Sequence, residues 1–302
     1  MPNSGDSSQK NDSNEALWML QHPVVPIFRM VQFLYLTGPF KVVEEIVAEM
    51  VEPIETNTAR YENPPLLLQP YLPIMKQIEN LKKEKGDGDQ AVPKIVDEHN
   101  KSVNKFTAME SWVGQQLLNA ELEKINSMLC GPCGCVLCCV GPDYDADPDS
   151  PRKMKQDFFE IPLTDEETDR FDLPKSDNAE TRSCTANSEP SMMLEGRPFF
   201  HHDPAIYHWQ NGWTMILPRK SICPQLAPKS RLCSIYGERP EVCRRPQIFP
   251  YLIEKTFNHS AYVVQNKMLA VWDCPYVKNY KQEIAAYAEV CGLAPVFMEN
   301  KG

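Results

Sequence analysis

The stretch CGPCGCVLCC, residues 130–139, holds five cysteines within ten residues. A free thiol packs like one small apolar group, and a hydrophobic core has no need of five of them side by side. A metal cation, in contrast, deprotonates coordinating thiols and holds several sulfurs close together. The stretch therefore predicts a metal centre, either an iron–sulfur cluster or zinc, bound by Cys130, Cys133, Cys135, Cys138 and Cys139.

Four further cysteines lie downstream, at Cys223, Cys233, Cys243 and Cys274. Prolines and charged residues separate the first three, and this composition disfavours one continuous helix through them. Loops of this kind can bring distant sulfurs around a shared centre. We expect these four cysteines to be metal ligands together with the first five, either in two four-cysteine centres or in one cluster with spare thiols.

The adjacent pair Cys138 and Cys139 carries information of its own. Neighbouring side chains on a strand point to opposite faces, so the pair favours ligation of two different metal atoms, or one ligand beside one packing residue. Gly131 and Gly134 allow the backbone to curl and to aim N–H groups at sulfur. Positive charge that could offset the thiolates is available from Arg239, Arg244 and Arg245.

The cysteine spacing matches neither standard zinc fingers nor the bacterial ferredoxin run, where Val136 stands in place of a required cysteine. The sequence also lacks a phosphate-binding glycine loop, a GxSxG elbow and an HExxH helix. The general indication of metal is therefore strong, the choice between iron–sulfur and zinc stays open, and no catalytic residue is predicted.

Three segments resemble a known family. CVLCC (residues 135–139) is similar to the core motif of the zinc- or iron-chelating cysteine-cluster family, the CxxCxxCC type, and FEIPLTDEE (159–167) to its short strand and following helix start. CSIYGERPEVCR (233–244) is similar to its second motif. In the middle segment, Thr164 and Glu167 also form a capping-box pattern.

The resemblance covers about residues 130–275 and implies a metal-chelating module. The family includes flagellin lysine N-methylases, so the resemblance also implies an iron–sulfur cluster, most simply 4Fe-4S, that serves redox or protein-lysine methyl-transfer chemistry. The chain departs from the family pattern in one respect. Cys130 and Cys133 compete for a position that the family fills with one thiol upstream of the core motif.

The composition excludes some classes of protein. The formal net charge of −10 over 302 residues argues against a surface that tracks nucleic-acid phosphates. The most apolar stretch, residues 24–40, contains Arg29 and prolines, so we expect a buried helix there and no stable membrane insertion. The N-terminus lacks the pattern of a signal peptide, and we expect a reducing cytoplasmic location, where clustered cysteines favour metal over disulfides.

The pattern along the chain predicts an α+β protein with a helical region packed on a loop-rich cysteine module. We expect a disordered tail over residues 1–14, helices over 15–129 and the metal-binding domain over 130–302. Individual helices are predicted at 42–50, 71–83, 104–128 and 281–290, and strands at 213–217 and 261–264. The apolar positions of the third helix fit one stripe, made of Phe106, Met109, Val113, Leu117, Leu118, Leu122 and Ile125. Residues 82–94 read as a surface loop or linker, and residues 176–191 as an exposed polar insertion in which Cys184 is no ligand.

Two functions remain open on the sequence. In the first, an iron–sulfur centre supports redox or methyl-transfer chemistry on a protein substrate. In the second, structural zinc stabilises a module whose helices recruit a partner protein. Cys291 is expected to be a plain thiol, and we interpret the acidic run over residues 143–149 and the motif around His201, His202, Asp203 and His208 as ordinary polar loops.

Overall fold

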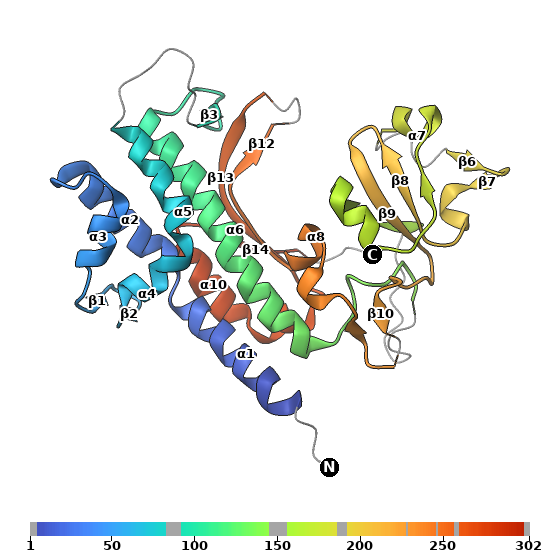
Figure 1. The fold of residues 1–302 in the computed structure, drawn as a ribbon, viewed down its shortest axis with the longest axis horizontal. Helices are drawn as coiled ribbons and strands as arrows, with labels where there is room; N and C mark the ends of the chain where they lie inside the picture. Colours follow the sequence, from blue (N-terminus) through green and yellow to red (C-terminus); the bar gives the residue numbers. More distant parts are fainter. Residues whose placement is uncertain are drawn as a thin grey trace. The chain divides into compact units, whose positions relative to one another are not determined.

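A computed structural model describes residues 5–82, 92–144, 156–185, 192–227, 229–245, 247–256 and 260–298. The protein is α+β, as the sequence predicts. The chain divides into two compact units, a helical unit built from Met1–Pro132 and Gln247–Glu299 and a cysteine-rich unit built on Cys133–Pro246. Each is described by itself (Figure 1).

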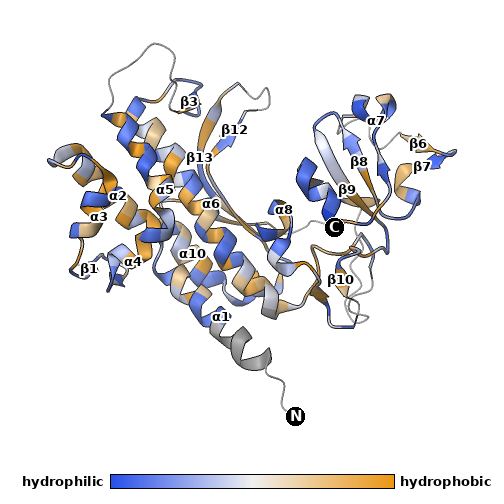
Figure 2. Ribbon diagram, in the orientation of Figure 1, coloured by the Kyte–Doolittle hydropathy of each residue, from blue (hydrophilic) through white to orange (hydrophobic). Residues whose placement is uncertain are grey.

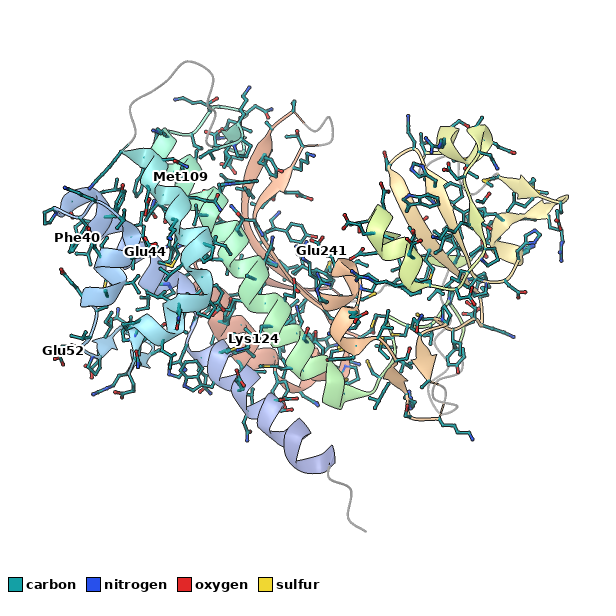
Figure 3. The ribbon with its side chains drawn as sticks, in the orientation of Figure 1. Phe40, Glu44, Glu52, Met109, Lys124 and Glu241 are labelled. Atoms are coloured by element: carbon teal, nitrogen blue, oxygen red, sulfur yellow. The ribbon has the colours of Figure 1, made fainter. Side chains whose placement is uncertain are left out.

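The helical unit is organised around α6 (Lys105–Cys133), which continues beyond the predicted end at residue 128. Apolar residues alternate with polar ones along it (Figure 2), and their spacing forms the predicted buried stripe. The stripe contains Met109, labelled in Figure 3, with Val113, Leu117, Leu118, Leu122, Ile125 and Leu129. Phe106, which we expected in this stripe, is instead 42% exposed.

The chain enters this unit through α1 (Gly5–Gln21), so the predicted disordered tail is wrong from Gly5 onward. Ala16 and Leu20 of α1 are buried. Glu15 of α1 forms an ion pair with Lys124 of α6, which is labelled in Figure 3 (Nζ–Oε1 2.7 Å). Once such a packed segment nucleates a helix, each preceding residue adds a hydrogen bond at little cost. The helix therefore extends backwards into the polar residues at the N-terminal end of α1.

The remaining helices of this unit match most of the predicted segments. The predicted helix over 71–83 is broken into short α and 3-10 pieces by prolines, and residues 83–91 of the expected linker lie outside the described residues. The elements are α2 (Val24–Thr37), α3 (Val43–Glu49), β1 (Ile54–Glu55), β2 (Arg60–Tyr61), α4 (Pro64–Leu68), η1 (Gln69–Tyr71), α5 (Leu72–Met75), η2 (Lys76–Leu81), α9 (Pro275–Asn279) and α10 (Lys281–Val290). Among described residues, no helix is long and apolar enough to span a membrane.

A sheet completes the helical unit, and its strands come mostly from the end of the chain. The central strand β13 (Tyr262–Val271) pairs antiparallel with β12 (Ile248–Lys255) and parallel with β14 (Ala294–Met298) and β3 (Ile95–Val96). A bulge interrupts β12 after Tyr251. The side chain of Gln115 on α6 compensates for it by accepting from two β12 backbone N–H groups and donating to the carbonyl of Pro250.

Residues 247–299 therefore belong with the helices in space, whereas the sequence-based boundary assigned them to the cysteine module. The difference arises because the parallel pairing of β13 with β3 joins segments far apart in the chain, and such pairing leaves no local sequence pattern.

The cysteine-rich unit contains a four-stranded sheet in the order β4–β9–β8–β5. The predicted strand over 213–217 is the interior of β9, and Thr164 and Glu167 form the predicted capping box at the start of η3. The elements of the sheet and this helix are β4 (Phe158–Leu163), η3 (Asp165–Arg170), β5 (Lys175–Ser176), β8 (Ala205–Trp209) and β9 (Gly212–Pro218).

The expected polar insertion over residues 176–191 is partly ordered structure, because the end of β5 and α7 (Ala179–Ser183) lie within it; residues 186–191 are outside the described part. Asn178 caps α7 by accepting from the N–H groups of Glu180 and Thr181. The remaining short elements are β6 (Met193–Leu194), β7 (Arg197–Pro198), η5 (Phe199–His201), β10 (Leu226–Ala227), β11 (Leu232–Cys233), η6 (Tyr236–Glu238) and α8 (Glu241–Arg244).

Candidate metal centre

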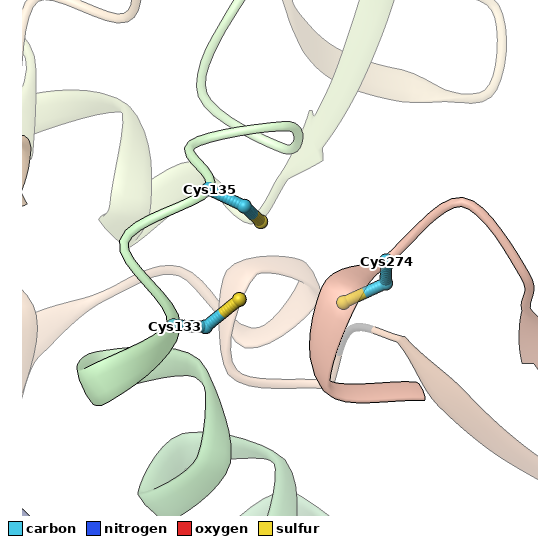
Figure 4. Close-up of side chains that lie close together, drawn as sticks. All are labelled: Cys133, Cys135 and Cys274. Carbon is cyan, nitrogen blue, oxygen red and sulfur yellow. The ribbon is translucent and has the colours of Figure 1, made fainter. Parts of the chain in front are cut away.

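Three predicted ligands come together at the C-terminal end of α6. Cys133 is the last residue of that helix, Cys135 follows two residues later, and Cys274 directly precedes α9. The three Sγ atoms all lie within 4.8 Å of one another, and Figure 4 shows the side chains pointing toward a common space. Cys274 is only 1% exposed, and the other two are half-buried. We call Cys133, Cys135 and Cys274 the thiol trio.

Local backbone geometry explains how Cys133 and Cys135 face the same point. Gly134 between them has φ +57°, a left-handed conformation that glycine adopts without steric cost. In an extended segment, side chains two residues apart would share one face but stand roughly 6.6 Å apart along the strand. Of the two glycines predicted to let the backbone curl, Gly134 does so, whereas Gly131 lies within α6.

Buried hydrogen bonds hold Cys274 against α6. Tyr276, two residues after Cys274, donates to Oδ1 of Asn126 on α6 across 2.7 Å, and its oxygen accepts from the backbone N–H of Gln247. Asn126 in turn donates to the carbonyl of Ile248 on β12. Our sequence reasoning missed this network; an asparagine inside the apolar stripe of α6 was the available signal.

The donor set of the thiol trio fits a borderline or soft metal, since thiolates select zinc and iron over hard cations. A tetrahedral zinc with Zn–S distances of about 2.3 Å spaces its sulfurs about 3.8 Å apart. Sulfurs already within 4.8 Å of one another need only a small inward movement to reach that spacing. Cys130 lies one helical turn before Cys133, on the same face of α6.

Four other predicted ligands gather in the cysteine-rich unit. The backbone N–H of Cys223 donates to the carbonyl of Cys139 across 2.8 Å. Cys139 and Cys243 both pack against the hydrophobic cluster that contains the buried Cys223. Cys233 ends β11, which pairs with β10 just after Cys223. We call these four residues the second thiol set.

The family comparison agrees with this concentration of sulfur. The profile of the CxxCxxCC family, described as "Putative zinc- or iron-chelating domain", matches residues 129–291, more than half of the chain. The chain belongs to this family. The resemblance expected from the sequence motifs is therefore confirmed. No curated protein and no solved structure matches the chain.

Within the CxxCxxCC domain, the pair Cys138 and Cys139 does not diverge as we expected. The two Sγ atoms lie 3.8 Å apart. The expectation assumed a strand, whereas these residues lie in a turn that is closed by a hydrogen bond from the N–H of Cys139 to the carbonyl of Val136. Val136 has φ +53°, which is strained for a β-branched residue.

Burial raises the pKa of two thiols in the second set, Cys223 and Cys243. It raises the pKa of Cys223 to about 11, with a smaller contribution from the nearby Cys233. It also raises the pKa of Cys243 to about 12, and negative charge on Cys223 adds to that rise. The thiols of Cys223 and Cys243 are therefore protonated near neutral pH in the metal-free domain, and a metal would have to displace their protons.

Arg239, one of the three predicted arginines, acts on a sulfur of the second set. Its side chain is only 6% exposed, its Nε donates to the carbonyl of Tyr236, and its guanidinium lies over the Tyr236 ring at 3.8 Å. Its positive charge lowers the pKa of Cys243 against the larger effect of burial. Arg245 is paired with Glu241 at the surface.

The remaining candidates lie away from these groups. All eleven cysteines fall within the described residues, and none is in a disulfide. Cys184 packs in a separate apolar cluster beside Met192, and Cys291 is a fully buried thiol of the helical unit, as expected. In the described part of the chain, the trio is the one group of three metal-binding side chains within 4.8 Å of one another, so the histidine motif forms no such group. Most of the acidic run, residues 145–149, lies outside the described residues.

Proposed function

We propose that this CxxCxxCC protein binds one zinc or iron ion through the thiol trio, with Cys130 as the fourth ligand. The observation that carries the proposal is the convergence of three sulfurs from two distant segments to within 4.8 Å. That spacing suits a single tetrahedral ion better than a cubane cluster, which places each thiolate on a different iron and spreads the sulfurs further. Zinc is the first choice of metal.

The role of this ion is structural. It would link the end of α6 to the start of α9. A metal that binds only the folded protein adds its binding free energy to the stability of the fold. Removal of the ion is therefore expected to loosen the contact that Asn126 and Tyr276 make beneath the trio.

An iron–sulfur cluster, 4Fe-4S, is the second candidate. The observation that favours it is the number of thiols, because the trio, Cys130, the second thiol set and Cys138 supply more sulfur ligands than one zinc uses. A cluster would give the redox or protein-lysine methyl-transfer chemistry that the sequence resemblance implies. The geometry of the cysteines supports metal binding.

The partner-recruiting role of the helices stays a prediction. The observation that bears on it is the exposure of large apolar side chains in the helical unit, where Phe33 of α2 is 63% exposed and Val51 and Leu66 are exposed as well.

Metal analysis of the full-length protein, purified without oxygen, tests the proposal. Bound zinc in a colourless protein supports a single ion, whereas bound iron with acid-labile sulfide and a brown colour supports the cluster. Cys274→Ser is expected to lose one metal centre per chain. Cys291→Ser is the matched control, since that thiol is equally buried in the same unit. Undiminished metal in a folded Cys274→Ser variant would overturn the proposal.

A further inference from the structure

A paired backbone segment brings the first two members of the second thiol set together. Besides the bond from Cys223 to Cys139, a bridge joins Val140 to Ile222, and the N–H of Gly141 donates to the carbonyl of Ser221 across 2.9 Å. Three consecutive residues on each side are thus held antiparallel. This pairing fixes the two cysteines as neighbours, although more than eighty residues of chain separate them.

A short hairpin adds the third member. After Cys223 the chain turns, with the N–H of Leu226 donating to the carbonyl of Cys223 across 2.9 Å. Leu226 then stands opposite Cys233 in the β10–β11 pair, and the N–H of Ser234 donates to the carbonyl of Gln225. The hairpin therefore returns Cys233 to the neighbourhood of Cys223.

Helix α8 adds the fourth. Its first residue, Glu241, donates its N–H to the carboxylate of Glu167 across 2.8 Å, and Glu167 is itself fixed in the capping box of η3. This anchor holds Cys243 against the core cluster that contains Cys223. Four cysteines thus arrive at one place from four separate segments of the chain.

Packing alone does not account for four thiols in one region, because a small apolar side chain would pack equally well at each of these positions. The other buried cysteines, Cys184 and Cys291, lie in two different regions of the chain. The nearly buried Arg239 beside Cys243 is a further indication, because a metal held by four thiolates carries net negative charge that a buried cation offsets.

We infer that Cys139, Cys223, Cys233 and Cys243 form a second metal centre, with ligands distinct from those of the thiol trio. Among the described side chains, the trio alone has its ligand atoms within 4.8 Å of one another, so the second set is spread more widely. Wider spacing suits an iron–sulfur cluster, in which each thiolate binds a different iron. The inference rests on the metal-chelating function proposed above but not on the trio itself.

Metal stoichiometry of paired variants tests this inference. The wild-type chain is expected to hold two centres, counting one ion or one cluster as a centre. Cys243→Ser is expected to lose the second centre and keep the metal of the trio, whereas Cys274→Ser loses the first and keeps the second. The matched controls Cys184→Ser and Cys291→Ser remove one buried thiol from each unit and should keep both centres.

The outcomes separate the two proposals. Unchanged metal content in Cys243→Ser overturns the second centre and leaves the first intact, while loss of all metal in either variant shows one shared centre and overturns the separation. No metal in the wild type overturns both. If Cys243→Ser does not fold, Cys233→Ser replaces it, because Cys233 is half-buried on a two-residue strand. Acid-labile sulfide gives a second readout, since a cluster at the second set should be lost from Cys243→Ser and retained in Cys274→Ser.

Discussion

Glu121 of α6 and Tyr287 of α10 share a 2.7 Å hydrogen bond between two completely buried side chains. The other carboxyl oxygen of Glu121 accepts from the backbone N–H of Val24, at the start of α2. One side chain thus joins three helices. Burial outweighs both hydrogen bonds and raises the pKa of Glu121 to about 8, and burial also raises the pKa of Tyr287 well above its ordinary value.

This carboxyl predicts that stability falls as the pH rises. Its pKa is about 8 in the folded protein against 4.5 for the free group, so between these values the folded state binds the extra proton. The free energy of unfolding should therefore decrease by up to about 1.4 kcal/mol per pH unit across that window. Glu121→Gln mimics the protonated form and should remove the dependence, as urea denaturation at several pH values would show.

The control for this prediction is Glu123→Gln, two residues along the same helix. Its stability should follow the wild-type pH profile. A Glu121→Gln variant that still loses stability as steeply as the wild type above about pH 6 would assign the dependence to another group.

Gly134→Ala is expected to weaken metal binding at the thiol trio. A Cβ there would have no heavy atom within 4 Å, so the cost is only that of the left-handed backbone, about 1–2 kcal/mol. Because Gly134 separates Cys133 from Cys135, this corresponds to roughly a tenfold loss of affinity in a competitive chelator titration. Gly237→Ala also has open space and no positive φ, and it should bind as tightly as the wild type. Equal affinity of both variants would show that the turn does not position the sulfurs.

Gly141→Ala should damage the second thiol set. A Cβ at this position would overlap the carbonyl oxygen of Pro218, which is rigid backbone. Relief of that overlap must move the segment that holds Cys139 against Cys223, at a cost of about 1–3 kcal/mol. We expect lower thermal stability and loss of metal from the second set, measured by elemental analysis, with retention of metal at the trio. A variant with both centres full would contradict the role given to this pairing.

Tyr276→Phe tests the network beneath the thiol trio. The change leaves Oδ1 of Asn126 without this donor and the N–H of Gln247 without this acceptor, which should cost about 1–3 kcal/mol in urea denaturation. Saturating zinc should recover part of the loss, because the metal independently joins α9 to α6. Tyr280→Phe, just after α9, is the comparison and should change little. Equal destabilisation by both changes would show that the hydrogen bonds of Tyr276 do not specifically stabilise the packing of α9 on α6.

Local patterns were enough to predict some of the fold. The helix over 281–290, the apolar stripe of α6 and the interior of β9 follow from periodicity that a short window of sequence contains. The sheet around β13 could not be predicted this way. Its parallel partner β3 lies far away in the chain, β14 follows only after α9 and α10, and pairing of this kind depends on the assembled fold.

For the candidate site too, local sequence patterns predicted one part, and the assembled fold determines the rest. Clustering of cysteines indicated metal, and the family motif supported it, but the grouping of Cys274 with Cys133 and Cys135 depends on where α6 ends and α9 begins. The expectation that the side chains of Cys138 and Cys139 diverge was wrong because it assumed a strand. A positive φ at Val136, which residue propensities disfavour, turns the backbone and brings both sulfurs to one side.

The late origin of β12, β13 and β14 has a consequence for biosynthesis. The helices of residues 5–132 emerge from the ribosome first, yet the strands that complete their core are translated only after all of residues 133–246. A nascent chain therefore carries uncovered apolar helices through the synthesis of the whole cysteine-rich segment, a state prone to aggregation. Premature termination just before β14 would thus harm the part of the protein that was made earliest.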